Sequence, residues 1–122
     1  MAILKGSKTE IDTKIEVYGD DNPDGAVVFM ATFRNLKQSD VREWLNAIGE
    51  VVERPWLMDK TVWLSKYLIG WKGFPAKTEE GDDVELEFNE ENVALVLDDP
   101  DYVNALYAAF TSVANGTAKA KN

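Results

Sequence analysis

The sequence predicts a single α+β domain: an N-terminal β-hairpin followed by about four helices, with a short extended arm or third strand between the second and third helix. Apolar residues recur every second position near the N-terminus and every third or fourth position after residue 39. The length of 122 residues suffices for one hydrophobic core and is too short for two. We expect a flexible leader over residues 1–12, the domain over 13–116 and a disordered tail over 117–122.

The first two strands are predicted by an alternating segment and a β-rich segment. Residues 13–18 place Ile15 and Val17 on one face and polar side chains on the other, and residues 26–33 are rich in Val, Phe and Thr. Between them, the segment Asn22-Pro23-Asp24-Gly25 supplies a turn, because Pro presets φ and Gly accepts a positive φ. An antiparallel hairpin follows.

Two helices are predicted in the middle of the chain. Ser39 is the expected N-cap of the first helix, with Asp40 in its first turn, and Gly49 is a candidate end. The second helix is expected to begin at Asp59 and run to Ile69, with Gly70 just beyond its C-terminus. Its apolar residues cover more than one stripe, which is typical of the central helix of a core.

The segment after this helix is predicted to be extended. Residues 71–83 have the composition of a loop, and Val84, Leu86 and Phe88 then alternate with Glu. Such alternation is typical of a short strand or an extended arm that docks on a neighbour.

Two further helices are predicted at the C-terminal end. Asn89 can cap a short helix that ends near Leu97. The segment Asp99-Pro100-Asp101 is the strongest helix start in the chain, because it combines a capping carboxylate, a prolyl first position and an acid favoured by the helix dipole. This last helix should end near Asn115-Gly116.

The composition argues against an enzyme. The chain has no Cys and no His, which excludes disulfides, thiolate ligands, Cys or Ser nucleophiles paired with imidazole, and the usual nitrogen-ligated zinc site. Adjacent acids such as Glu90 and Glu91 lie in a segment dense with like charge, so nothing predicts the raised pKa that a catalytic carboxyl needs. We expect no catalytic residues and no cofactor.

A metal site is not expected either. The segment from Asp20 to Gly25 matches the opening of a calcium-binding loop, but position 12 of that loop, which should be a bidentate Glu, is Ala31. A hairpin turn accounts better for this segment.

The net charge of −9 is unevenly distributed. Residues 1–77 contain 11 acids and 11 bases, whereas the other 11 acids lie between Glu79 and Asp101, with no basic residue from Thr78 to Ala118. This acidic segment, residues 79–101, disfavours contact with nucleic acid and with anionic lipid. The longest apolar runs are too short for a signal peptide or a membrane span, so we expect a cytoplasmic protein.

Aromatic residues suggest where a partner binds. Trp44 and Trp63 have the helical spacing of core residues, whereas Trp56 and Trp71 lie at predicted element ends, where they could form a partly exposed apolar patch. Together with the extended arm, this patch gives the candidate partner-binding residues: Trp56, Trp71, Phe74, Val84, Leu86 and Phe88.

Two segments resemble the tail assembly chaperones of long-tailed bacteriophages. One is Ala31-Thr32-Phe33-Arg34-Asn35-Leu36-Lys37-Gln38-Ser39-Asp40, a strand that ends in an aromatic residue before a helix cap. The other is Leu68-Ile69-Gly70-Trp71-Lys72-Gly73-Phe74, followed by the acidic loop, the short arm and the two C-terminal helix starts. The resemblance covers roughly residues 26–115.

This resemblance implies a role without catalysis. Such chaperones coat the long, helical, aggregation-prone tape-measure protein during tail assembly, and a longer form made by ribosomal frameshifting recruits tail-tube subunits. They act in the host cytoplasm and are absent from the finished virion. The residues Ala120-Lys121-Asn122 can be encoded by a slippery heptamer, which is compatible with a frameshifted form. From the sequence itself, the arm at 84–88 would allow a homo-oligomer by arm exchange between copies, or a ring or spiral around a client, and the sequence does not choose between them.

Two other functions are compatible with the sequence. An acidic mimic of nucleic acid, which inhibits a DNA-binding protein, is suggested by the density of carboxylates between residues 79 and 101. A structural tail or head-completion protein is the other, and it would be found in purified virions.

Overall fold

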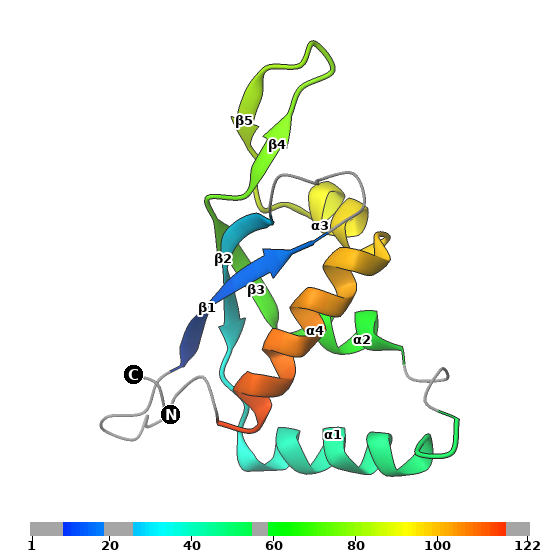
Figure 1. Cartoon of the computed structure of the whole chain (residues 1–122). Helices are drawn as coiled ribbons and strands as arrows, with labels where there is room; N and C mark the ends of the chain where they lie inside the picture. The colour runs from blue at the N-terminus through cyan, green and yellow to red at the C-terminus, as the bar shows by residue number, and fades with distance from the viewer. Residues whose placement is uncertain (1–8, 19–25, 55–58, 117–122) are drawn as a thin grey trace.

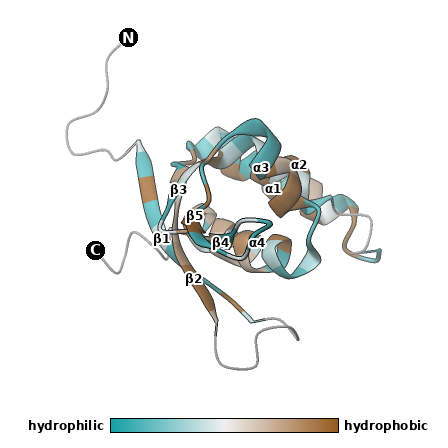
Figure 2. Cartoon of the chain, turned by 90° about the horizontal axis from the view of Figure 1, so that it is seen from above, coloured by the Kyte–Doolittle hydropathy of each residue, from teal (hydrophilic) through white to brown (hydrophobic). Residues whose placement is uncertain are grey.

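A three-stranded antiparallel sheet forms one layer of the structure, and the helices lie on one side of it (Figures 1 and 2). The computed structural model describes residues 9–18, 26–54 and 59–116. The α+β class and the N-terminal hairpin predicted from the sequence are confirmed. The predicted turn at 22–25, the first eight residues of the leader and the tail at 117–122 lie outside the described residues.

The hairpin consists of β1 (Glu10–Val17) and β2 (Val27–Arg34), with Ile15 opposite Phe29 and Ile11 opposite Phe33. The buried residues alternate with exposed ones along both strands, as Figure 2 shows for β1 by its alternating colours. Because β1 begins at Glu10, the predicted boundary of the leader at residue 12 is three residues too late.

The third strand of this sheet is β3 (Leu68–Lys72), which pairs with β2 and follows α2 (Lys60–Tyr67) directly. The prediction that α2 continues to Ile69 and ends at Gly70 is wrong. Leu68 and Trp71 are buried three positions apart, a spacing that fits a helix and equally fits a strand with the register shift found opposite Thr32 and Phe33. The sequence pattern alone could not separate the two.

The helix starts follow the predicted caps in three of four cases. The carboxylates of Asp59 and Asp99 and the amide oxygen of Asn89 accept backbone N–H bonds at the starts of α2, α4 (Pro100–Ala114) and α3 (Glu90–Leu97), at 2.8–3.0 Å. The helix α1 (Gln38–Glu50) begins earlier than expected, with Lys37 as N-cap in place of Ser39.

The core is centred on α4 rather than on α2. Figure 1 shows α4 lying across the sheet, and its contacts with β1 are the most extensive that any helix makes with a strand. The side chains of Leu106 and Phe110 are fully buried. On α2, Trp63, Leu64 and Tyr67 are buried but Val62 is exposed, so α2 fills one side of the core.

A second hairpin occupies the segment predicted to be a loop and an arm. The strands β4 (Pro75–Lys77) and β5 (Asp83–Glu85) pair antiparallel and project from the body of the molecule (Figure 1). The sequence predicts only the second half of this hairpin to be extended. Short strands of three residues give too little alternation to predict from sequence.

The hydroxyl of Thr13 identifies a weak point of the core. Its oxygen is buried on the inner face of β1 and has no hydrogen-bond partner among the described residues. Because an unpaired buried hydroxyl is unfavourable, we expect Thr13→Val to raise the free energy of unfolding by about 1 kcal/mol, or the melting temperature by about 4 °C.

A matched control lies on the outer face of the same sheet. The hydroxyl of Thr32 donates to Asp12 at 2.6 Å across the β1–β2 pair, so Thr32→Val loses a hydrogen bond and should not stabilise the protein. Thermal unfolding of both variants compares the two sites. A fall in stability for Thr13→Val would show that its hydroxyl is paired in solution.

Candidate functional site

The acidic segment identified in the sequence lies at one end of the molecule, formed by the β4–β5 hairpin, α3 and the start of α4 (Figure 1). All eleven carboxylates of residues 79–101 are on exposed residues. Lys77 is the last residue of β4 before the turn and pairs with Asp83 at 2.9 Å, with both side chains well exposed. An exposed pair of this kind contributes little and offsets only one of these charges. We call this region the acidic end.

The tip of the hairpin is closed by backbone bonds and by Thr78. The N–H of Thr78 donates to the carbonyl of Asp82 at 2.9 Å, and the N–H of Asp82 donates to the hydroxyl of Thr78 at 3.1 Å. Gly81 has a φ of 90°, which favours glycine at this position. The tip therefore has a defined turn that presents Glu79 and Glu80 to solvent.

Aromatic rings anchor the base of the hairpin to the core. Phe74, which immediately precedes β4, stacks on Phe29 of β2 at 4.2 Å and on Tyr102 of α4 at 5.4 Å between ring centroids. Trp71 of β3 meets Phe88 edge to face at 4.7 Å, just before α3. These contacts join the sheet, the hairpin, α4 and the segment that leads into α3.

Three hydrogen bonds tie the two sides of the hairpin base together. The indole N–H of Trp71 donates to the carbonyl of Leu86 at 2.7 Å, and the N–H of Leu86 donates to the carbonyl of Phe74 at 2.8 Å. The N–H of Gly73, which has a φ of 65°, donates to the carboxylate of Glu85 at 2.6 Å. The segment that follows β5 is thus held against its own chain.

These contacts correct the predicted surface patch. Trp71 is only 7% exposed, so the prediction that it forms part of an exposed patch is wrong. Phe74, predicted with it as a partner-binding residue, is only 3% exposed. Leu86 and Phe88 are half-buried and pack against the core, whereas Val84 is 43% exposed. The sequence shows that aromatic residues lie at the ends of elements. It does not show whether a hydrogen-bond acceptor in the interior, such as the Leu86 carbonyl, keeps their side chains buried.

The remaining aromatic predictions have mixed outcomes. Trp44 and Trp63 are buried in the core, as predicted. Trp56 lies outside the described residues, as does the segment from Asp20 to Gly25 that resembles the start of a calcium loop.

A groove lies between the base of the hairpin and the α3–α4 corner. It has a volume of about 260 Å³ and is lined by Phe74, Pro75, Ala76, Leu95, Val96, Asp99 and Tyr102. The pKa of the Tyr102 hydroxyl is raised, first by burial and then by the carboxylate of Asp99. Apart from Asp99, the lining is apolar or aromatic.

Of the residues that line this groove, the sequence predicted only Phe74 as a partner-binding residue, and Leu95 is among those it missed. Leu95 is 64% exposed, whereas Val93, Val96 and Leu97 of the same helix pack against the core. A signal was present, because these three residues share one helical face and Leu95 lies away from it.

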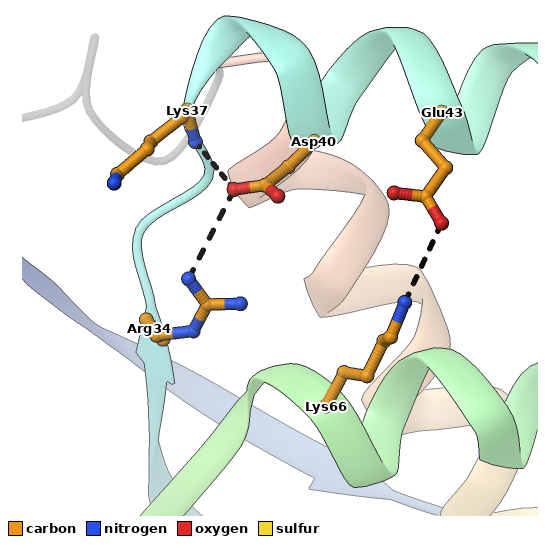
Figure 3. A network of polar contacts seen from close by, with 5 residues as sticks. All are labelled: Arg34, Lys37, Asp40, Glu43 and Lys66. Atoms are coloured by element: carbon orange, nitrogen blue, oxygen red, sulfur yellow. Dashed lines mark hydrogen bonds and ion pairs between the residues drawn. The ribbon is translucent and has the colours of Figure 1, made fainter.

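At the opposite end of the molecule, acidic side chains lie close to basic ones (Figure 3). Asp40 accepts the backbone N–H of Lys37 at 2.9 Å and lies 3.9 Å from the guanidinium of Arg34, while Glu43 of α1 lies 3.5 Å from Lys66 of α2. Basic and acidic groups here come from different elements and neutralise each other. The zero net charge of residues 1–77 is therefore partly made up of ion pairs between neighbouring elements.

Trp44 is the buried residue of α1 and joins this helix to α4. The indole N–H of Trp44 donates to the hydroxyl of Tyr107 at 2.9 Å, and the ring meets Phe110 of α4 edge to face at 5.5 Å. Leu45, next to it on α1, is 51% exposed.

No group of three or more acidic, His or Cys side chains that could hold a metal ion occurs within residues 9–18, 26–54 and 59–116. In the same ranges, no helix is both long enough and apolar enough to cross a membrane.

Comparison with known proteins gives no relative: no family model, no curated protein and no solved structure matches this chain.

The hydrogen bond from Trp71 to Leu86 can be tested by Trp71→Phe, which keeps an aromatic ring and leaves the carbonyl unpaired. We expect a loss of about 1–3 kcal/mol in the free energy of unfolding. Amide hydrogen exchange should accelerate more in the hairpin, for example at Thr78, than in β1 and β2, because the bond closes the hairpin base.

The matched control is Trp44→Phe, which loses a similar bond to Tyr107 at the other end of the molecule. It should accelerate exchange in α1 and leave the hairpin unchanged. If both variants accelerate exchange equally throughout the chain, the hairpin is not anchored locally.

Proposed function

We propose that this protein is a tail assembly chaperone of a long-tailed bacteriophage, which binds the tape-measure protein, keeps it soluble and helps recruit tail-tube subunits. The observation that carries the proposal is the acidic end, where exposed carboxylates and exposed Val84 and Leu95 are presented on a firmly anchored hairpin and helix corner. Such a surface suits binding to a protein segment, and the role needs no catalysis.

The resemblance of two segments to this family supports the proposal. The first segment spans the end of β2 and the start of α1, and the second begins with β3 and leads into the hairpin, α3 and α4. The second resembling segment thus leads into the same hairpin and helices that form the acidic end. The role places the protein in the host cytoplasm and outside the mature virion, with a longer form made by frameshifting as a further part of the proposal.

A long helical client would be bound by many copies, each with a weak contact. Because an exposed acidic surface attracts basic segments over a distance set by the salt concentration, such contacts form and exchange rapidly. Exchange of the arm at 84–88 between copies would first have to break the bonds of Leu86 with Phe74 and Trp71.

Co-expression tests this proposal. The tape-measure protein encoded by the same phage should be insoluble when produced alone and should remain in the supernatant, and co-purify, when produced with this chain. The control is an unrelated protein of similar size and net charge. If the client is equally insoluble with and without this chain, the proposed function is wrong.

Analysis of purified virions separates the proposal from a structural role. A chaperone should be absent from particles by mass spectrometry, whereas a tail or head-completion protein would be present in fixed copy number. Detection at such a stoichiometry would overturn the chaperone assignment.

A second candidate function is inhibition of a DNA-binding protein by mimicry of nucleic acid. It is favoured by the eleven exposed carboxylates at one end of the molecule. A mimic should displace a labelled DNA duplex from such a protein at concentrations near its own Kd. Under the chaperone proposal, this chain should leave a panel of host DNA-binding proteins on their DNA.

A further inference from the structure

We infer that the groove between β4 and the α3–α4 corner binds a basic amphipathic segment of the client by taking up one large apolar side chain. The inference rests on the proposed function and names the binding face and the chemistry of the bound segment.

The walls and floor of the groove are apolar and come from three elements. The groove is lined by Phe74 and Tyr102, whose rings stack at 5.4 Å, by Pro75 and Ala76 of β4, and by Leu95 and Val96 of α3. The volume of about 260 Å³ lies below that of common small-molecule pockets, which is about 300–1,000 Å³. It therefore fits a single side chain better than a whole small molecule.

The charged residue that lines the groove is acidic, and so are its charged neighbours on α3 and α4. Asp99 lines the groove, Asp98 and Asp101 flank that residue, and Glu91 lies one helical turn before Leu95 on α3. All four residues are exposed, and the sequence has no Lys or Arg between residues 78 and 118. Charge complementarity thus selects a segment whose apolar anchor is flanked by Lys or Arg.

The groove is formed before a partner arrives. Two of its lining residues, Phe74 and Tyr102, belong to the aromatic stack, and the hairpin base is closed by the bonds of Leu86. The corner is fixed by Asp99, which accepts the N–H of Asp101 at 2.9 Å. A preformed site avoids the cost of ordering a loop on binding, so one anchor side chain can give measurable affinity.

Fluorescence anisotropy with a labelled peptide tests the inference. The probe is an amphipathic helix of about 20 residues made of Leu and Lys, and two comparison peptides replace every Lys by Glu or every Leu by Ser. We expect binding of the first peptide only, weakening as NaCl rises because the rim contacts are exposed.

Leu95→Asp blocks the groove with a charge, and Leu45→Asp makes the same change on α1, away from the acidic end. Both leucines are more than half exposed, so neither variant should unfold the protein. We expect Leu95→Asp to raise the Kd of the Leu–Lys peptide about tenfold or more, which corresponds to 1.4 kcal/mol, and Leu45→Asp to change it less than about twofold.

The rim is tested without changing the groove. The double variant Glu91→Gln, Asp98→Asn should weaken binding and reduce its salt dependence, whereas Glu50→Gln, Glu53→Gln at the end of α1 should do neither. Equal effects of the two double variants would show that only net charge matters and would overturn the inference.

Other outcomes also overturn it. Equal Kd values for Leu95→Asp and Leu45→Asp would place the peptide elsewhere, and binding of the Glu peptide would contradict the charge argument. If wild type self-associates in sedimentation and Leu95→Asp is monomeric, a second copy occupies the groove.

The same variants separate this inference from the proposed function. If wild type and Leu95→Asp both keep the tape-measure protein soluble, the groove inference fails and the chaperone function stands. If wild type does not keep it soluble, the proposed function fails whatever the peptide shows.

Discussion

The mutual stacking of Phe29, Phe74 and Tyr102 is the contact on which the arrangement of the acidic end depends. It joins the central strand β2, the entrance of the second hairpin and the first turn of α4, three segments far apart in the chain. Aromatic pairs bury large areas and have preferred geometries, so the stack fixes both the position and the direction of the hairpin. A hairpin of two three-residue strands would not be stable on its own.

Trp71 adds to the aromatic stack and holds the segment after β5 against the body of the protein. Its ring contacts Phe88 and its indole N–H reaches the carbonyl of Leu86, so one side chain of β3 holds two positions of the later chain. Trp71, which the sequence predicts to be partly exposed, is therefore a buried support of this surface. Val84 and Leu95 are accessible residues of the same surface.

Local signals in the sequence predict the parts of the fold that depend on local chemistry. The starts at Asp59, Asn89 and Asp99 were predictable because an N-cap is satisfied within its own first turn. The strand β3 was not, because the pairing of Gly70 with Thr32 is a contact between distant residues and overrides a helix-compatible spacing. For the same reason, the burial of Trp71 and the groove at Leu95 required the tertiary structure.

The concentration of carboxylates at the acidic end affects binding in two ways. At the α1 end, Asp40 and Glu43 lie beside bases from neighbouring elements, whereas the carboxylates of the acidic end face a single paired lysine, Lys77, among the described residues. Two copies approaching by this end repel each other, which protects the exposed Leu95 and Val84 from self-association. A basic segment meets attraction at the rim and an apolar site beneath it. The same surface thus disfavours contact with a second copy of the chain and favours contact with a basic segment.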